Sequence, residues 1–355
     1  MENHRIDEHK LIYHPKRVVE WLDSGDCYPI YVEVSPSGKC NHRCIFCALN
    51  YMSYEAPFLE GSLLEQRLKE MSCLGVRAIM LAGEGEPLLH PDIGHIVQVS
   101  WSAGLDVSIT TNGVFLDRIF DVVDKLSWVR VSLDASSAKT YSEIHGCSPV
   151  DFSKVISNLE QLVHLKKERH LKCTIGTQLL LLEDNYKEAE ELSLFLGEMG
   201  VDYFSIKPYS PHPLSTSRAV PITDNTELLL LEEKVKLSET RTRQKGNNNF
   251  QASFRREAFS RVGIKKRYNK CLGSSFFCHL TSLGEIYSCS TFLGKPEFSY
   301  GNIYERPFKE IWKGERRQRI MQEVDVSTCR ENCRLDPINN YLWKLKHSPA
   351  HVNFI

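Results

Sequence analysis

Segments with strand patterns alternate with segments of helical periodicity through much of this chain of 355 residues. Apolar, β-branched segments predict strands at residues 31–35, 77–81, 106–111, 129–133, 174–181 and 203–207. Helices are predicted at residues 15–24, 93–103, 114–126, 138–144, 152–167 and 186–199. Strands that follow one another through helical connections form a parallel sheet with helical cover. The sequence therefore predicts an α/β fold over residues 28–215.

The loop after the first predicted strand carries Cys40, Cys44 and Cys47, with the spacing Cys-x3-Cys-x2-Cys. Three thiolates on one loop each bind one iron of a [4Fe–4S] cube and leave the fourth iron open. A structural zinc site needs four ligands, and no fourth Cys or His stands in register nearby in the sequence. His42 is expected to be solvated. The loop is therefore predicted to hold an iron–sulfur cluster.

This cysteine loop, with Phe46 just before its last cysteine, resembles the motif of the radical S-adenosylmethionine (SAM) superfamily. The resemblance implies a partial (β/α)6 barrel and SAM bound at the open iron. It also implies that an electron cleaves SAM to a 5′-deoxyadenosyl radical, which abstracts a hydrogen atom from the substrate. A flavodoxin or ferredoxin would donate the electron.

Residues after the later strands resemble elements that line SAM in this superfamily. Gly85, Glu86 and Pro87 match its Gly-Gly-Glu-Pro element, and Glu84 stands where the first glycine usually is. Ligands of parallel barrels bind at the C-terminal ends of the strands. A plain turn at Asn112 remains an alternative. The resemblance implies SAM contacts from Phe46, Gly85, Glu86, Pro87, Thr111, Asn112, Ser132, Asp134 and Gln178.

Candidates for moving a proton or a hydrogen atom are Lys207, Tyr209, Cys278 and Glu84. All four are reactive residue types that we expect near the mouth of the barrel. Lys207 ends a predicted buried strand, and a buried lysine needs an anionic partner. A purely structural role is the alternative for Gln178, Lys207 and Tyr209, and a satisfied strand-end hydroxyl is the alternative for Ser132.

A second set of cysteines follows residue 270: Cys271, Cys289, Cys329 and Cys333. A helix is predicted at residues 308–324, ahead of the last pair. The order resembles the twitch extension, a shortened SPASM domain, which implies one auxiliary [4Fe–4S] cluster that relays electrons. Cys278 is an alternative ligand to Cys271, and a zinc site or buried structural cysteines are alternatives to the cluster. The remaining cysteines are predicted to be buried thiols: Cys27, Cys73, Cys147 and Cys173.

The same patterns predict how the chain is divided. The predicted parts are an N-terminal helical extension (1–27), the radical SAM barrel (28–215), a linker with a helix at 226–242 and a strand at 250–262 (216–267), the auxiliary-cluster domain (268–340) and a tail (341–355).

Composition limits the partners and the compartment. The net charge of −1 argues against nucleic acids and anionic membranes as partners. The leucine-rich runs are too short to span a bilayer, and the N-terminus lacks the apolar core of a signal peptide. Twelve cysteines without such a signal indicate a reducing compartment. The protein is expected to be cytoplasmic.

The sequence constrains the substrate less than it constrains the fold and the cofactors. The SPASM/twitch group cross-links, epimerises or excises parts of ribosomally made peptides, and it also oxidises small sugars and aminocyclitols. Because only 39 residues precede Cys40, a peptide enzyme of this length would need a separate leader-recognition protein. A basic run at residues 255–267 is either an anion site or a solvated face. We favour a peptide substrate, with a small sugar or aminocyclitol as the alternative and a non-catalytic iron–sulfur redox protein as a third class.

Overall fold

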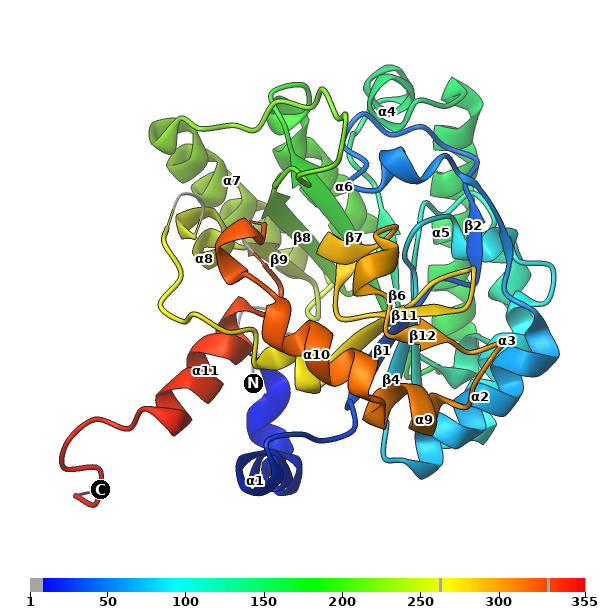
Figure 1. Cartoon of the computed structure of the whole chain (residues 1–355). Helices are drawn as coiled ribbons and strands as arrows, with labels where there is room; N and C mark the ends of the chain where they lie inside the picture. Colours follow the sequence, from blue (N-terminus) through cyan, green and yellow to red (C-terminus); the bar gives the residue numbers. More distant parts are fainter. Residues whose placement is uncertain (1–8, 262–263, 331–332, 355) are drawn as a thin grey trace.

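The computed structural model describes residues 9–261, 264–330 and 333–354. Its centre is a sheet in the order β12-β11-β10-β1-β4-β5-β6-β7-β8-β9 (Figure 1). The six middle strands are parallel to their neighbours: β1 (Tyr31–Val34), β4 (Ala78–Leu81), β5 (Asp106–Thr111), β6 (Leu126–Ser132), β7 (Thr174–Leu181) and β8 (Tyr203–Pro208). They are the predicted strands in the predicted order, so the parallel α/β sheet is confirmed.

Further strands extend this sheet at both edges. β9 (Gln251–Phe254) lies parallel to β8, and β10 (Phe277–Leu280) lies parallel to β1. β11 (Glu285–Tyr287) and β12 (Gly301–Asn302) continue from β10 in antiparallel order. The auxiliary-cluster region therefore shares the sheet of the barrel. A separate pair, β2 (Ser37–Lys39) and β3 (Glu55–Phe58), flanks the cysteine loop.

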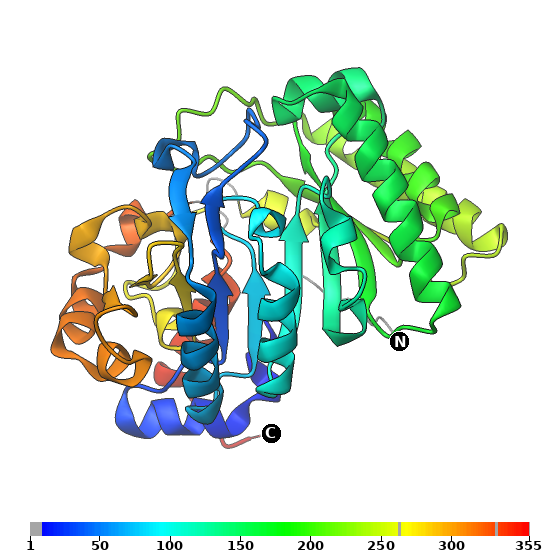
Figure 2. The same ribbon diagram turned by 90° about the vertical axis from the view of Figure 1, so that its right-hand side faces the viewer.

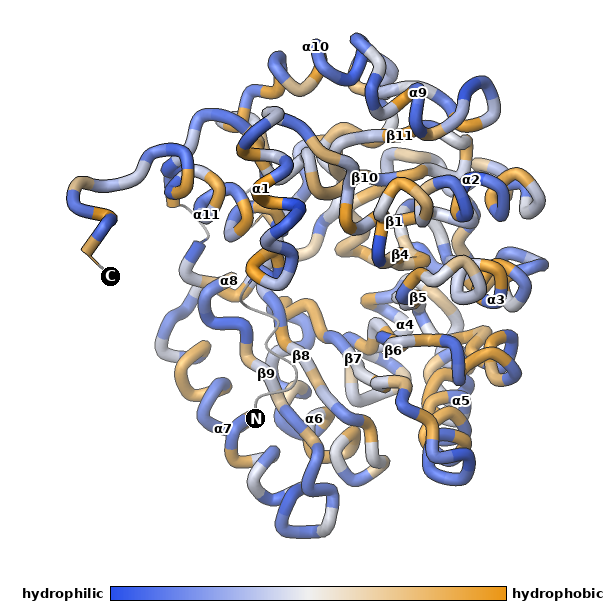
Figure 3. Tube along the Cα trace, turned by 90° about the horizontal axis from the view of Figure 1, so that it is seen from below, coloured by the Kyte–Doolittle hydropathy of each residue, from blue (hydrophilic) through white to orange (hydrophobic). Residues whose placement is uncertain are grey.

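The helices of residues 61–199 lie along one face of the sheet, and the C-terminal segments lie beside β1 (Figure 2). Figure 3 shows hydrophilic and hydrophobic residues alternating along helices such as α5 and α7. The helices are α1 (Pro15–Ser24), α2 (Gly61–Cys73), α3 (Ile93–Ser102), α4 (Ala138–His145), α5 (Pro149–Glu168), α6 (Ala189–Met199), α7 (Asn225–Gln244), α8 (Arg256–Ser260), α9 (Phe308–Lys313), α10 (Glu315–Glu323) and α11 (Asp336–Lys346).

The two faces of the sheet differ in polarity. Val32, Ile109 and Ile206 belong to the apolar core. The alternate residues of the same strands, such as Glu33 and Lys207, point to the opposite face because successive side chains of a strand alternate. We call this second, polar face the inner face. Ligands of parallel barrels bind where this face meets the C-terminal ends of the strands.

Two predicted helices are wrong. Residues 114–126 form two short 3₁₀ helices, Leu116–Ile119 and Val123–Lys125. The amide of Asn158 donates to the carbonyls of Gly113 (3.1 Å) and Val114 (2.9 Å), and so takes an acceptor that an α-helix starting at Val114 would use. The helix predicted at 308–324 breaks at Gly314, whose backbone is extended between α9 and α10.

Other elements differ in extent or were missed. The strand predicted at 250–262 ends at Phe254 and α8 follows it, while residue 262 lies outside the described residues. Helix α2 was not predicted, and α11 continues across the predicted boundary at residue 340. Cys73 is exposed and Cys147 is half-buried, although both were predicted to be buried. No helix within the described ranges combines the length and apolarity that crossing a membrane requires.

Candidate iron–sulfur and substrate site

The cysteine loop is held in place from two sides. On one side, the backbone N–H groups of Arg43 and Ile45 donate to the last carbonyls of α4, at 3.0 and 2.9 Å. Gly146 caps this helix with φ +56°, and a Cβ there would lie 2.3 Å from the carbonyl oxygen of Arg43. On the other side, the hydroxyl of Ser215 donates to the carbonyl of Cys47 at 2.9 Å. The loop is therefore preorganised by residues far from it in sequence.

The three thiols of the loop lie close enough to influence one another. Burial, together with Glu86 and Cys47, raises the pKa of the Cys40 thiol to about 11. Burial and the neighbouring Cys40 and Cys47 hold the pKa of Cys44 well above its ordinary value. Metal binding displaces such protons, since the thiolate is the ligand. Three converging thiols on one loop fit a [4Fe–4S] cluster with one open iron.

The Gly85-Glu86-Pro87 segment packs directly on this loop. A Cβ on Gly85 would lie 2.4 Å from the carbonyl oxygens of both Lys39 and Ser37, so only glycine fits there. The backbone N–H of Glu86 donates to the carbonyl of Lys39 at 2.8 Å. The predicted motif therefore meets the cysteine loop backbone to backbone.

The side chain of Glu86 ties the same segment to the end of β5. Its carboxylate accepts from the Thr111 hydroxyl (2.6 Å) and from the backbone N–H groups of Asn112 (2.8 Å) and Leu88 (3.0 Å). The Asn112 amide in turn donates to Asn41 of the cysteine loop at 2.8 Å. The structure thus brings the predicted residues that follow β4 and β5 together at the cysteine loop. The side chains of Glu86 and Asn112 form hydrogen bonds with other protein groups there.

A buried chain of polar side chains runs from β6 to the cysteine loop. The Ser132 hydroxyl donates to Asp134 at 2.9 Å, and the backbone N–H of Leu180 donates to the other carboxylate oxygen at 2.6 Å. His145 lies with Nε2 3.1 Å from Asp134 and Nδ1 3.5 Å from Cys44 Sγ. Asp134 and His145 are fully buried. Asp134, predicted to line SAM, therefore faces His145.

The sequence prediction was wrong for one histidine at this loop, His42, and did not identify another, His145. His42 is 1% exposed and pairs with Asp151 at 3.1 Å, so it is not solvated as predicted. His145 was not identified as a site residue. It lies about a hundred residues after Cys44, so no local spacing connects the two.

Glu84 links the barrel to the auxiliary-cluster region. It accepts from the backbone N–H of Ser282 at 2.8 Å and from the Ser282 hydroxyl. Its other carboxylate oxygen, Oε2, is buried and has no hydrogen-bond partner among the described residues. Burial raises the pKa of this carboxyl group. Glu84, which stands where the superfamily usually has a glycine, therefore connects the two regions. Its Oε2 atom has no hydrogen-bond partner among the described residues.

The second set of cysteines also converges. Burial and the nearby Cys289 and Cys271 raise the pKa of Cys333 to about 12. Burial and the same two thiols, partly offset by Lys266, raise the pKa of Cys329 to about 11. Four thiols from three separate segments therefore meet at one place, and this donor set fits an iron–sulfur cluster.

Cys278 lies apart from this set. It is a fully buried residue of β10, paired in register with Val32 of β1. Burial raises the pKa of its thiol, and the charge of Arg317 partly offsets this rise. Of the two alternatives left open by the sequence, the structure places Cys271 with the other three thiols and Cys278 in the core.

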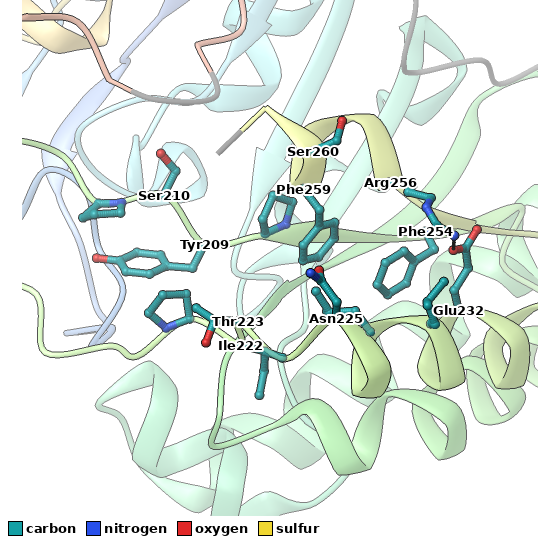
Figure 4. A pocket seen from close by; sticks show the side chains of 15 residues that line it. Tyr209, Ser210, Ile222, Thr223, Asn225, Glu232, Phe254, Arg256, Phe259 and Ser260 are labelled. Carbon is teal, nitrogen blue, oxygen red and sulfur yellow. Dashed lines mark hydrogen bonds and ion pairs between the residues drawn. The ribbon is translucent and has the colours of Figure 1, made fainter. Parts of the chain in front are cut away.

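Tyr209 lines a hollow of about 790 Å³ beside the end of β8 (Figure 4). Apolar side chains such as Phe254 and Phe259 line it, and Arg256 and Glu232 form an ion pair of 2.8 Å at its side. The Tyr209 hydroxyl is buried and has no hydrogen-bond partner within the described ranges.

An α/β barrel that gathers three thiols and a Gly-Glu-Pro segment at its strand ends defines an enzyme built around an iron–sulfur cluster. The chain belongs to the radical SAM superfamily, because residues 34–213, just over half of its length, match the family model described as Radical SAM superfamily. Residues 271–334 match SPASM, described as an iron–sulfur cluster-binding domain. The protein is thus a radical SAM enzyme with a SPASM domain, and the non-catalytic alternative no longer applies.

Known proteins resemble it to different extents. An AdoMet-dependent heme synthase of Methanosarcina barkeri is 26% identical over 294 residues, which are 77% of this chain and 79% of that protein. A GTP 3′,8-cyclase of Chlorobaculum tepidum is 35% identical over 118 residues, so the match spans only 36% of that protein. The structure of Streptococcus suis SuiB bound to precursor peptide SuiA is similar with a TM-score of 0.63 and 20% identity, covering 89% of this chain and 73% of that one. This last likeness shows the fold.

Proposed function

We propose that this protein reductively cleaves SAM at a cluster held by Cys40, Cys44 and Cys47 and abstracts a hydrogen atom from a ribosomally made peptide. The bound cluster and SAM supply the electron and the 5′-deoxyadenosyl radical. The product is a cross-link, an epimerised residue or a peptide with an excised piece of backbone. A flavodoxin or ferredoxin donates electrons, and a separate protein recognises the leader.

The position of Tyr51 between the two cysteine sets carries this proposal. Burial raises the pKa of Tyr51 to about 12, and Glu84, Cys289 and Cys47 add to the shift. One side chain is therefore near a thiol of each set. A substrate radical formed beside the first cluster is then within reach of an electron acceptor at the second, which suits an oxidative modification.

The contacts within the site suggest a division of labour among the predicted SAM residues. We assign SAM contacts to Phe46, Gly85, Pro87, Thr111, Ser132 and Gln178. Glu86 and Asn112 instead hold the cysteine loop against β4 and β5, as their hydrogen bonds require. Fixing the loop relative to the strand ends positions the reacting atoms, a major source of rate enhancement.

A peptide substrate is supported by the similarity in fold to SuiB, whose structure includes a precursor peptide. The hollow at Tyr209, about 790 Å³ with a mainly apolar lining, is large enough for several side chains.

The second candidate is the oxidation of a small molecule such as a sugar or an aminocyclitol. It is favoured by the similarity to the AdoMet-dependent heme synthase, which covers 77% of this chain and whose name gives heme as its product. The inner face of the sheet, which carries polar and charged side chains, suits a small polar substrate as well.

The test is substrate-dependent release of 5′-deoxyadenosine by the full chain after anaerobic cluster reconstitution. Host extract is divided by ultrafiltration into a metabolite fraction and a macromolecular fraction, and each is added with reductant and SAM. Stimulation by the macromolecular fraction alone supports a peptide, and stimulation by the metabolite fraction alone supports the small-molecule candidate. A variant with Cys40, Cys44 and Cys47 replaced by alanine is the control, and release by this variant would contradict the assignment of the cluster.

A further inference from the structure

Cations from distant parts of the chain gather on the inner face of the sheet. Lys207 is the penultimate residue of β8, and Arg130 lies on β6. Arg255 follows β9, and Arg334 follows the last cysteine of the second set. Burial lowers the pKa of Lys207 well below its ordinary value, and the charges of these three arginines lower it further. Four cationic side chains therefore share one region.

The carboxylate of Glu33 offsets this charge only in part, and its effect on the pKa of Lys207 is smaller than that of each of the three arginines. It is engaged by Arg334, which donates to it, and by His279 at 3.5 Å. Within the described residues, no carboxylate lies at ion-pair distance from Lys207 or Arg130, and no hydrogen bond reaches the Lys207 amino group. The sequence led us to expect an anionic partner for Lys207, and within the described residues the nearby carboxylate, Glu33, is already engaged by Arg334.

Polar atoms without partners surround the same place. Gln178 Oε1, Ser205 Oγ and Arg130 Nε are buried and form no hydrogen bond in the part of the chain that the structure describes. Gln178 and Ser205 are direct neighbours across β7 and β8, and Ser205 is two residues before Lys207, so all lie on the inner face. Ser205 is 1% exposed. Buried polar groups in folded proteins are nearly always hydrogen-bonded, so such a group of orphans indicates a bound polar ligand.

Arg130 is held toward this region by its other contacts. Its guanidinium donates to the Thr110 hydroxyl at 3.0 Å and stacks over Trp128, 5.1 Å from the ring centroid. It also forms a hydrogen bond with Tyr203, whose ring occupies the space left by Gly176, where a Cβ would lie 2.1 Å from it. The guanidinium is thus oriented while Nε stays available.

We propose that the inner face around Lys207, Arg130 and Ser205 binds an oxyanion of the substrate, a carboxylate or a phosphate. The Lys207 ammonium and the Arg130 guanidinium are its charged donors, and the Ser205 hydroxyl adds a neutral one. A bound anion stabilises the protonated form of Lys207, which burial and the nearby arginines disfavour. The inference rests on the proposed function and specifies its substrate class: a molecule or peptide side chain with an anionic group next to the position of hydrogen abstraction.

The test measures binding of two probes, inorganic phosphate and succinate, to the reconstituted SAM-loaded full chain by equilibrium dialysis at constant ionic strength. We expect saturable binding of at least one probe and a loss of affinity of about tenfold or more in Lys207→Met, because a charge-assisted hydrogen bond is lost. Lys207→Arg keeps the charge and should retain most of the affinity. The control Lys245→Met removes a 67% exposed lysine that pairs with Glu198, and it should bind like the wild type.

The outcomes separate this inference from the proposed function. Phosphate binding alone identifies a phosphate-bearing substrate, and succinate binding alone a carboxylate. Equal affinity of the wild type and a folded Lys207→Met variant, or saturable binding of neither probe, overturns the oxyanion site. Cleavage of SAM by the wild type under strong reductant is measured in the same preparations. If that cleavage is absent, the proposed function fails whatever the probes do.

Discussion

The two cysteine sets of this protein are built in opposite ways. Cys40, Cys44 and Cys47 lie within eight residues of one another, whereas Cys271 and Cys333 lie at the ends of a segment of more than sixty residues. All three cysteines of the first set lie on one loop, so the rest of the fold has only to hold that loop in place. The second set exists only after β10, β11 and the segment following α10 have come together. The predicted clusters should therefore respond differently to the same kind of change.

The largest expected effect is the loss of SAM cleavage when Cys40, Cys44 and Cys47 are replaced by alanine, because the open iron has no other protein ligands. The second set should still hold about four irons per chain. Iron analysis and 5′-deoxyadenosine release measure the two results in one preparation. An iron-free triple variant would show that the second set holds no independent cluster.

Next in size is the loss of the auxiliary cluster in Cys333→Ala, since one of four thiolates is removed from a site assembled by tertiary contacts. Uncoupled SAM cleavage should persist, while substrate turnover should fall by at least about tenfold. Cys278→Ala is the matched control from the same region. If Cys278→Ala loses the auxiliary iron and Cys333→Ala keeps it, the ligand assignment is wrong.

A smaller effect is expected where the barrel meets the cysteine loop. Gly85→Ala places a methyl group 2.4 Å from two backbone carbonyls, so the loop must shift. We expect a loss of stability of about 1–3 kcal/mol and weaker SAM binding. Gly94→Ala is the control, because its nearest neighbour would lie 3.8 Å away and alanine favours a helix. Thermal unfolding measures the stability of the two variants, and titration with SAM measures their affinity. Equal stability and affinity of Gly85→Ala and Gly94→Ala would contradict the close packing of Gly85 on the cysteine loop.

The smallest effect is expected at His145. Its side chain contacts Cys44 of the first set, and among the described residues it has no hydrogen bond to a thiol of the second set. His145→Leu removes the imidazole nitrogen that lies 3.5 Å from Cys44 Sγ, and hydrogen bonds to sulfur raise the potential of such clusters. The midpoint potential of the first cluster should fall by about 40 mV, the one-electron equivalent of about 1 kcal/mol. Redox titration followed by EPR measures it. His95→Leu at an exposed position is the control, and an unchanged potential in His145→Leu would make His145 a packing residue only.

Much of the fold was predictable because its determinants are local. The β-branched segments that became β1, β4 and β5 are short, apolar and bounded by turn residues. The helix predicted at 114–126 failed because Asn158, on a different helix, competes for its carbonyls. The pairing of β10 with β1 has no local signal, since its partners are more than two hundred residues apart.

By itself, the sequence determined the parallel sheet, the cysteine loop and the Gly85-Glu86-Pro87 motif, because each depends on residues close together in the chain. Only the tertiary structure decided that His145 reaches Cys44 and that Cys271 and not Cys278 joins the second set. It also decided that Lys207 and Arg130 share one face, with no carboxylate at ion-pair distance from either among the described residues. The physical reason is that charge balance and ligand geometry depend on distances in space. Sequence spacing fixes such distances only within a loop, a turn or a single strand.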